Sequence, residues 1–265
     1  MRSRFLDPAP PVAFAHRGYS PAGAENSMAA FAAAVALGYQ YVETDARVTA
    51  DAVAVAFHDD RLDRVTDRRG RLDRLPWDHV ARARIRGTDA VPRLDELLGE
   101  WPQLRVNVDV KSGPALAAAI DAITRTRAQD RVCLAAFSDV RLRRIRALVG
   151  PDVCTALGPG EVALLLAATR SGRRVGPALT GALRGRAAQL PPQAAGLALA
   201  TSAVLETAHQ AGLAVHVWTV NDPARISTLL DLGVDGIMTD EAGTLRDLLV
   251  TRAAWPTPYP RSNGG

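Results

Sequence analysis

Apolar segments of four to eight residues alternate with helical patterns along almost the whole 265-residue chain. Segments of this length bounded by turn residues are typical of strands. Eight such strands are predicted: Val12–His16, Tyr41–Val48, Arg105–Lys111, Val132–Phe137, Val153–Leu157, Ala187–Leu190, Ala214–Val220 and Gly236–Thr239. Strands that alternate with helices indicate a parallel sheet, and eight repeats of this unit indicate a closed barrel.

Helical patterns fill most of the intervals. They span Asn26–Leu37, Arg93–Glu100, Pro114–Ala128, Val140–Val149, Glu161–Arg170, Ser202–Ala211, Ala224–Leu232 and Thr244–Ala253. We therefore predict an α/β fold, a single-domain (β/α)8 TIM barrel over residues 1–253, followed by a flexible tail over 254–265. A doubly wound sheet is less favoured because no G-x-G-x-x-G turn follows the first strand. The interval between His58 and Val91 is too short for an inserted domain.

The charge pattern argues against a nucleic-acid partner. The formal net charge is +4, but the arginines of "RLDRVTDRRGRLDRL" (61–75) are mixed with aspartates, and aromatic residues make up 5% of the chain. A nucleic-acid surface gathers positive charge and interleaves it with aromatic residues. A solvated surface of mixed charge is the expected outcome.

The cysteines and the hydropathy pattern predict a cytoplasmic protein without stable membrane insertion. Cys133 and Cys154 lie in apolar segments and lack the C-x-x-C spacing of a metal or redox site, so we expect buried thiols. No apolar segment approaches the ~18 residues of a membrane span, and the N-terminal residues contain no secretory signal pattern. The oligomeric state is left open.

Polar residues stand where the first three predicted strands end. His16 and Arg17 end the first strand, and Glu43 and Asp45 of "YVETDARV" share one face of the second. On the third strand, "RVNVDVK", the polar residues alternate with valines; they are Asn107, Asp109 and Lys111. Lys111 is the only lysine in the sequence. Catalytic groups of TIM barrels lie at these strand ends, so we expect the polar residues to converge there.

Three converging carboxylates would repel one another unless a cation neutralises them. Glu43, Asp45 and Asp109 offer oxygen ligands, which favour a hard divalent cation, Mg²⁺ or Ca²⁺, over Zn²⁺. The alternative is a half-exposed strand with a polar outer face. That alternative is disfavoured because helices cover the outer face of a parallel barrel.

His58 follows an alternating segment, "AVAVAFHDD", and completes a possible catalytic set. Two histidines beside a carboxylate cluster suit general acid–base chemistry near neutral pH. Arg17 and Lys111 supply positive charge of the kind that binds a phosphate.

The remaining aromatic and imidazole residues are less informative. His79 and His209 lie in helical patterns, where surface or packing roles are expected. His216 could serve in the core, support a site residue or contact substrate. Trp218, at the end of the seventh strand, could line a substrate pocket or pack in the core. Motifs of serine hydrolases, zinc proteases and nucleoside triphosphatases are missing from the sequence.

Taken together, the motifs resemble those of the glycerophosphodiester phosphodiesterase family. The matching segments are "AHRG" (15–18), "ENS" (25–27), "VETDARVT" (42–49), "FHDDRLDRVTD" (57–67), "VPRLDELL" (91–98), "VDVK" (108–111), "VWTVND" (217–222) and "LGVDGIMTD" (232–240). They occur in the family's order. The resemblance implies a TIM barrel, a divalent cation, and hydrolysis of a small glycerophosphodiester, such as glycerophosphocholine or glycerophosphoethanolamine, to sn-glycerol 3-phosphate and an alcohol.

The resemblance also implies roles for individual residues. His16 and His58 match the acid–base pair, and Glu43, Asp45 and Asp109 match the metal ligands. Phosphate contacts are implied for Arg17 and Lys111, and a substrate contact is expected for Trp218. Glu25 and Asn26 match a loop that supports the site. Which histidine is acid and which is base stays open, as does the nucleophile, water or the glycerol 2-hydroxyl.

Two departures from the family pattern keep alternatives open. Asp109 stands where the family usually has glutamate, and Ala24 where it usually has proline. Aspartate at this place is similar to the sphingomyelinase D and lysophospholipase D type of phosphodiesterase, which is the second hypothesis. A non-catalytic barrel that binds phosphodiesters is a third, less favoured because no histidine or carboxylate of the set is missing.

Overall fold

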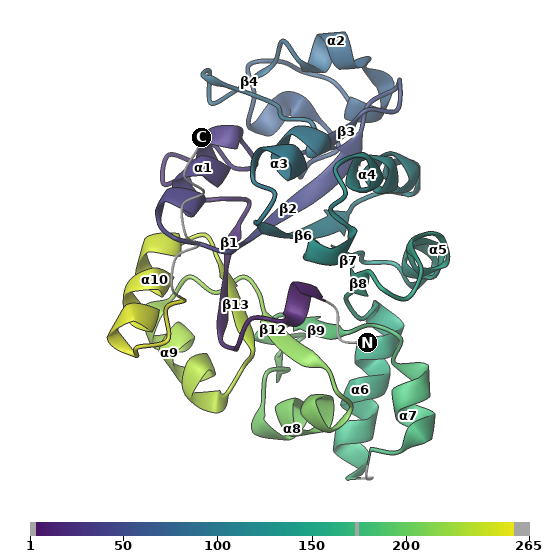
Figure 1. Ribbon diagram of the computed structural model, residues 1–265, viewed down its shortest axis with the longest axis vertical. Helices are drawn as coiled ribbons and strands as arrows, with labels where there is room; N and C mark the ends of the chain where they lie inside the picture. The colour runs from purple at the N-terminus through teal and green to yellow at the C-terminus, as the bar shows by residue number, and fades with distance from the viewer. Residues whose placement is uncertain (1–3, 173–174, 257–265) are drawn as a thin grey trace.

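The computed structural model describes residues 4–172 and 175–256, and it confirms the predicted (β/α)8 barrel. Eight parallel strands form its wall: β1 (Val12–His16), β2 (Tyr41–Val48), β6 (Arg105–Val110), β7 (Val132–Ala135), β8 (Cys154–Thr155), β9 (Ala187–Leu190), β12 (Ala214–Val217) and β13 (Gly236–Thr239). Their order around the sheet is β8-β7-β6-β2-β1-β13-β12-β9. A single parallel bridge between Ala156 and Ala187 closes the ring (Figure 1).

The described residues form ten α-helices, and all of them except α2 lie around this ring (Figure 1). They are α1 (Met28–Ala36), α2 (Trp77–Val80), α3 (Leu94–Glu100), α4 (Gly113–Arg125), α5 (Asp139–Val149), α6 (Pro159–Ser171), α7 (Pro177–Ala182), α8 (Ser202–Gln210), α9 (Pro223–Leu232) and α10 (Ala242–Thr251). Ser27, Ser112 and Ser138 cap α1, α4 and α5 by accepting a backbone N–H through the side chain. The predicted helices recur with shifts at their ends; α7 and the β10–β11 hairpin (Gln193–Ala194, Leu197–Ala198) were not predicted.

An apolar plug fills the end of the barrel at which the strands begin. The short helix η1 (Arg4–Leu6) inserts Phe5, which is fully buried. Its ring packs edge-on against Tyr41 at 5.1 Å between centroids, and lies 6.2 Å from Phe14. Figure 1 shows η1 in front of the strands, next to the N label. The polar side chains that line the cavity described below lie toward the other end of the barrel.

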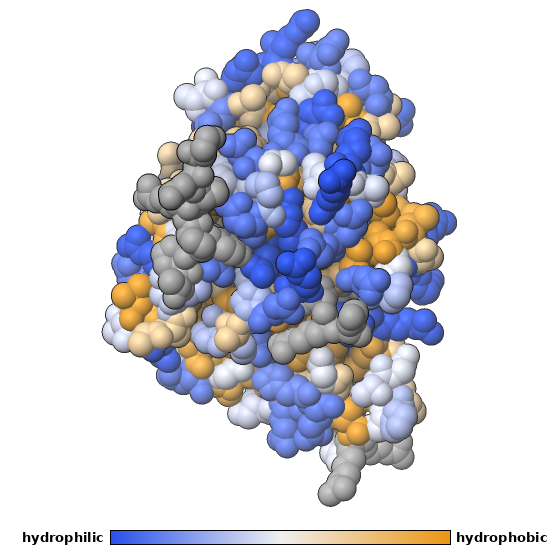
Figure 2. Space-filling view, in the orientation of Figure 1, coloured by the Kyte–Doolittle hydropathy of each residue, from blue (hydrophilic) through white to orange (hydrophobic). Residues whose placement is uncertain are grey.

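One segment leaves the barrel between β2 and β6. β3 (Ala54–Ala56) returns antiparallel along β2, and residues 57–91 then build a lobe from η2 (Leu62–Arg64), η3 (Leu72–Arg74), α2, β4 (Arg84–Ile85) and β5 (Asp89–Ala90). The lobe has its own apolar cluster, which includes Phe57, Leu62 and Ile85. It lies at the top of Figure 1, and its surface is mostly hydrophilic in Figure 2. The lobe is a small extension of the single barrel domain, and none of the predicted strands and helices lies within it.

The arginines of the lobe pair with aspartates, as the mixed-charge pattern predicts. Arg71 contacts both Asp60 and Asp73 at about 3 Å, and Arg61 contacts Asp63 at 3.1 Å. These pairs are exposed, and such pairs add little stability.

The predicted tail falls largely outside the described residues. Its first residues pack on the barrel: Ala254 and Trp255 contact the core, and the Trp255 ring lies edge-on to Tyr39 at 5.0 Å. Residues 257–265 lie outside the described ranges. Among residues 4–172 and 175–256, no helix combines the length and hydropathy that a membrane span requires.

Candidate active site

The polar residues of the first three barrel strands meet in two layers because of strand register. His16 on β1 pairs with Glu43 on β2, which pairs with Asn107 on β6. One layer further along, Asp45 is directly opposite Asp109. Side chains two residues apart on a strand share a face, so both layers point into the barrel mouth. All five residues line one cavity of about 410 Å³.

The β1–α1 loop is folded so that Arg17 lines this cavity and Asn26 supports it from behind. Arg17 and Asn26 both have left-handed backbone conformations, with φ of 57° and 59°. Gly18 between them has φ of 82°, and a Cβ at this position would lie 2.6 Å from the backbone of Ala30. Only glycine fits this approach. The buried Asn26 donates to Asp45 Oδ2 at 3.0 Å and accepts from Thr44 at 2.7 Å, so the loop holds Asp45 in place.

His58 reaches the mouth through the hairpin of β2 and β3. Phe57 N donates to Asp45 O at 2.9 Å, which puts the next residue beside the carboxylates. Arg47 Nε donates to His58 O, also at 2.9 Å. The sequence predicts correctly that an alternating strand precedes His58, but β3 is an antiparallel return and not a barrel strand.

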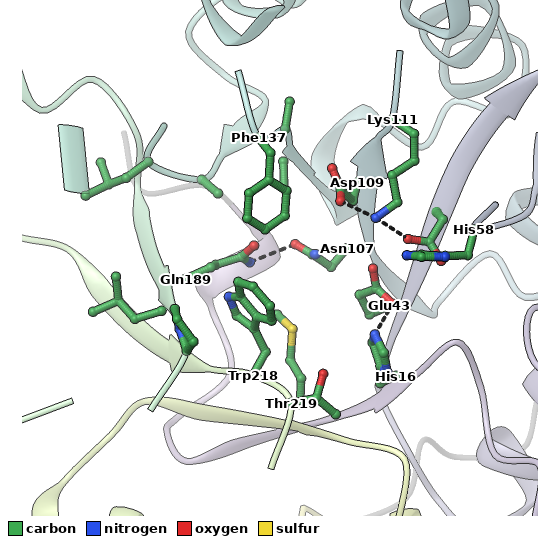
Figure 3. A pocket seen from close by; sticks show the side chains of 18 of the residues that line it. His16, Glu43, His58, Asn107, Asp109, Lys111, Phe137, Gln189, Trp218 and Thr219 are labelled. Atoms are coloured by element: carbon green, nitrogen blue, oxygen red, sulfur yellow. Dashed lines mark hydrogen bonds and ion pairs between the residues drawn. The ribbon is translucent and has the colours of Figure 1, made fainter. Parts of the chain in front are cut away.

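Lys111 stands between two of the carboxylates. Its Nζ lies 2.7 Å from Asp45 Oδ1 and 2.6 Å from Asp109 Oδ2, and Figure 3 shows it reaching across the mouth. Burial alone would raise the pKa of Asp45, but Lys111 and Arg17 outweigh it and lower the value. For Asp109 burial dominates and raises the pKa. The pKa of Glu43 is raised to about 8 by burial and then by the charge of Asp45.

The carboxylates retain unused oxygens. Glu43 Oε2 and Asp109 Oδ1 are buried and have no hydrogen-bond partner. Within the described ranges, no group of three or more histidine, cysteine or acidic side chains lies close enough together to hold a metal ion. The donor set is nevertheless all carboxylate, which is the chemistry that Mg²⁺ and Ca²⁺ prefer. Orphaned carboxylate oxygens in a water-accessible mouth fit such a cation.

Each of the two candidate catalytic histidines has a carboxylate at Nδ1. His16 Nδ1 lies 2.6 Å from Asp240 Oδ1, and Asn221 donates to the other oxygen of Asp240 at 2.8 Å. His16 Nε2 lies 3.7 Å from Glu43 Oε2. Burial would lower the pKa of His16, but the carboxylates of Glu43 and Asp240 outweigh it, so the pKa is raised.

The partner of His58 comes from the adjacent residue. His58 Nδ1 lies 2.7 Å from Asp59 Oδ1. Asp59 in turn accepts two hydrogen bonds from Arg64, and these lower its pKa to about 2. Since Nδ1 is engaged in both rings, Nε2 is the nitrogen that each histidine has left for a substrate.

The cavity has two unlike walls. His16, His58, Glu43, Asp109 and Lys111 occupy one side in Figure 3, and aromatic residues face them from the other. The apolar wall is formed by Phe137, Leu157, Val162, Leu190 and Trp218, among others. Trp218 and Phe137 pack edge-on at 5.5 Å, and Phe137 is 67% exposed. Between the walls, Gln189 donates to Asn107 at 2.8 Å.

The structure brings most of the predicted site residues to this cavity. His16, Arg17, Glu43, Asp45, His58, Asp109, Lys111 and Trp218 line it. Glu25 and Asn26 lie behind it, bonded to Arg17 and Asp45 respectively. Among the other histidines, His216 is buried against Phe14, and burial lowers its pKa to about 4. His209 pairs with Asp235 on the surface.

Sequence reasoning missed the residues that support the two histidines. Asp240 directly follows the last strand and Asn221 follows the seventh, so the strand-end rule could have indicated both. Asp59 is adjacent to His58. Arg64 lies in a 3-10 turn of the lobe, and nothing in the sequence pattern distinguishes it from its neighbouring arginines.

Known proteins are similar in sequence to almost the whole chain. Residues 16–244 match the glycerophosphoryl diester phosphodiesterase family. The chain belongs to this family. A "Probable glycerophosphodiester phosphodiesterase 2" of Mycobacterium tuberculosis is 39% identical over 245 residues, which cover 92% of either chain. A glycerophosphodiester phosphodiesterase of Caldanaerobacter subterraneus is 26% identical over 260 residues, covering 90% of this chain and 97% of the relative. The family predicted from the motifs is thus confirmed, and with it the prediction of a phosphodiesterase.

Solved structures agree in fold. A glycerophosphodiester phosphodiesterase of Agrobacterium tumefaciens superposes with a TM-score of 0.74 at 22% identity, covering 90% of this chain and 99% of that one. A phosphodiesterase of Oleispira antarctica, solved with its product sn-glycerol 3-phosphate, has a TM-score of 0.75 at 20% identity, covering 91% and 97%. At these identities the likeness establishes the shared barrel.

Proposed function

We propose that this member of the family hydrolyses small glycerophosphodiesters, such as glycerophosphocholine and glycerophosphoethanolamine, to sn-glycerol 3-phosphate and an alcohol. The observation that carries the proposal is the pair of histidines flanking the carboxylate cluster, each with a carboxylate at Nδ1. The product bound to the Oleispira phosphodiesterase has the chemistry expected here.

Glu43, Asp45 and Asp109 would hold a divalent cation, Mg²⁺ or Ca²⁺. The unpartnered oxygens of Glu43 and Asp109 support this assignment. A bound cation of this kind polarises a phosphate oxygen and lowers the pKa of an attacking hydroxyl. Asp109 is one methylene shorter than the glutamate usual in the family, and its register opposite Asp45 keeps it in the same layer.

His16 and His58 act as the acid–base pair. One ring removes the proton from the attacking hydroxyl at its Nε2, and the other protonates the leaving alkoxide. The carboxylates of Asp240 and Asp59 hold the rings and stabilise the charged imidazolium. If the glycerol 2-hydroxyl attacks, a cyclic phosphate is formed first; if water attacks, it is not.

Arg17 and Lys111 bind the phosphate, and Trp218 contacts the remainder of the substrate. Both cationic side chains line the cavity. Glu25 and Asn26 support this set by holding Arg17 and Asp45. A small molecule is therefore the proposed partner, and the free, buried thiols of Cys133 and Cys154 are in keeping with a reducing, cytoplasmic location.

The test is release of glycerol 3-phosphate from glycerophosphocholine and glycerophosphoethanolamine, with Mg²⁺, Ca²⁺ or EDTA. We expect release by the wild type with a cation, none with EDTA, and release lowered by about a hundredfold or more in His16→Ala. His209→Ala is the matched control, because His209 also pairs with an aspartate but lies outside the cavity. Release that is unaffected by EDTA would refute the cation, and no release from either diester would refute the substrate.

The apolar wall favours a second candidate, hydrolysis of a lysophospholipid. The polar head groups of small glycerophosphodiesters gain little from Leu157 and Val162, whereas a single acyl chain would cover these side chains and remove them from water. Under this candidate, lysophosphatidylcholine yields lysophosphatidic acid, and Phe137→Ser lowers that activity several-fold without changing turnover of glycerophosphocholine. Leu197→Ser, an exposed leucine outside the cavity, is the control. Equal effects of Phe137→Ser on both substrates would count against it.

A further inference from the structure

Arg64 joins two carboxylates that belong to different parts of the site. Its Nε and Nη2 donate to Asp59 at 2.6 and 3.1 Å, and its Nη1 and Nη2 donate to Glu25 at 3.2 and 2.6 Å. Asp59 lies in the lobe segment that follows β3, and Glu25 lies in the β1–α1 loop. One guanidinium thus connects the lobe to the barrel beside the catalytic mouth.

The oxygens that Arg64 Nη2 contacts are the same ones that hold the site residues. Asp59 Oδ1 also contacts His58 Nδ1 at 2.7 Å, and Glu25 Oε1 also accepts from Arg17 Nη1 at 2.9 Å. Arg17 Nε lies 3.1 Å from Asp45 Oδ2. A continuous chain of contacts therefore runs from His58 through Arg64 to the carboxylate cluster.

The geometry requires an arginine. A planar guanidinium can grip two carboxylates in a fixed fork, whereas the ammonium of a lysine is a single point charge. Burial would raise the pKa of Glu25, but hydrogen bonds from Arg64 help to lower it. Without Arg64, two neighbouring carboxylates would lose their common cation, and neither would be held in the plane that its partner needs.

We propose that Arg64 is a positioning residue that fixes the ring of His58 and the guanidinium of Arg17 at the same time. This inference rests on the proposed function, since it assigns Arg64 to the reaction that those two residues serve. Among the described residues that line the cavity, Arg64, Asp59 and Glu25 do not occur. Arg64 therefore acts through its partners and not on the substrate.

The experiment compares wild type, Arg64→Ala, Arg64→Lys and the control Arg61→Ala on glycerophosphocholine with saturating cation. Arg61 lies on the same turn and pairs with Asp63, away from the cavity. We expect kcat of Arg64→Ala to fall about 10- to 100-fold, with a rise in KM from loss of the Arg17 contact. Arg64→Lys is expected to recover little, and Arg61→Ala to match wild type.

Two further readouts separate positioning from a merely structural role. Added guanidinium ion should restore part of the kcat of Arg64→Ala, because the ion can occupy the space between Asp59 and Glu25 that the Arg64 side chain has left. It should have no such effect on Arg61→Ala. Arg64→Ala combined with Asp59→Asn should lose little more than the worse single variant, because both disturb one unit.

The outcomes distinguish this inference from the proposed function. A wild type that releases no glycerol 3-phosphate overturns both. An active wild type with Arg64→Ala within twofold of it, or Arg64→Lys at full activity, overturns the positioning role alone. Strictly additive losses without guanidinium rescue would also overturn it, since Arg64 would then act independently of Asp59.

Discussion

The two histidines of the mouth are held by different parts of the molecule. His16 ends a barrel strand, and its partner Asp240 directly follows another strand, β13, with Asn221 behind it. His58 lies outside the barrel wall, and its partner Asp59 is held by an arginine of the lobe. The same pairing of imidazole and carboxylate is thus built once by sheet geometry and once by ion pairs.

The two imidazole rings therefore differ in their exposure to solvent and in what holds them in place. The side chain of His16 is 16% exposed, and that of His58 is 35% exposed. Strand register determines the first pairing, so it follows from the fold itself. The second depends on side chains in a loop, and loops are where site residues can vary without loss of the scaffold.

Loss of either imidazole should have the largest effect and tests whether the two rings are equally needed. We expect His16→Ala and His58→Ala each to lower kcat by about 10²- to 10⁴-fold, the usual share of general acid–base catalysis. Steady-state kinetics with saturating cation measures this. If His58→Ala kept most of the activity, the two histidines would not be equivalent in function, because only His16 would then be needed for the reaction.

Neutralising the supporting carboxylates should have an intermediate effect. Asp240→Asn is expected to lower kcat about 10- to 100-fold and to lower the pKa of His16, since the carboxylate of Asp240 helps to raise it. An NMR titration of the His16 ring in the metal-free protein measures the shift. Asp59→Asn serves as the counterpart: it should lower kcat but leave the His16 titration unchanged. A His16 pKa that moves equally in both variants would show that the pairings are not independent.

The smallest effect is expected from His216. It serves as a reference because it is a barrel histidine whose Nδ1 has no hydrogen-bond partner. Its folded pKa of about 4 lies below the ordinary value of 6.5, so the unfolded chain binds more protons between these values. Stability from this group is therefore full above pH 6.5 and is lost as the pH falls toward 4. In urea unfolding, the free energy of unfolding of the wild type should fall by about 2 kcal/mol more between pH 7 and pH 5 than that of His216→Phe. Equal losses would mean that His216 is not held neutral.

Much of the barrel and of the polar wall could be predicted from the sequence, because both follow from periodicity. Alternation along "RVNVDVK" fixes which side chains share a face, and the strand-end rule places them at the mouth. The β10–β11 hairpin and the lobe could not be predicted in the same way. Their short strands carry no long pattern, and the lobe cluster assembles from residues spread between Val55 and Val91.

The supporting contacts of the site were the hardest to predict. Arg64 approaches Glu25 across 39 residues, and Asp240 approaches His16 across 224. The periodicity of a sequence predicts which residues share a face of one helix or strand. It does not predict contacts between residues that are far apart in the chain. Phe137 was placed at the end of a strand, but its edge-on contact with Trp218 depends on the loop that follows β7.

Lys111, held between Asp45 and Asp109, has a practical consequence for chelation experiments. The cluster carries a resident counter-ion of its own, so removing a divalent ion does not leave three bare negative charges facing one another. The apoprotein is expected to stay folded in EDTA, with a melting temperature lowered only by the lost binding energy of the cation. Activity lost on chelation would then report on the chemistry of the mouth and not on collapse of the barrel.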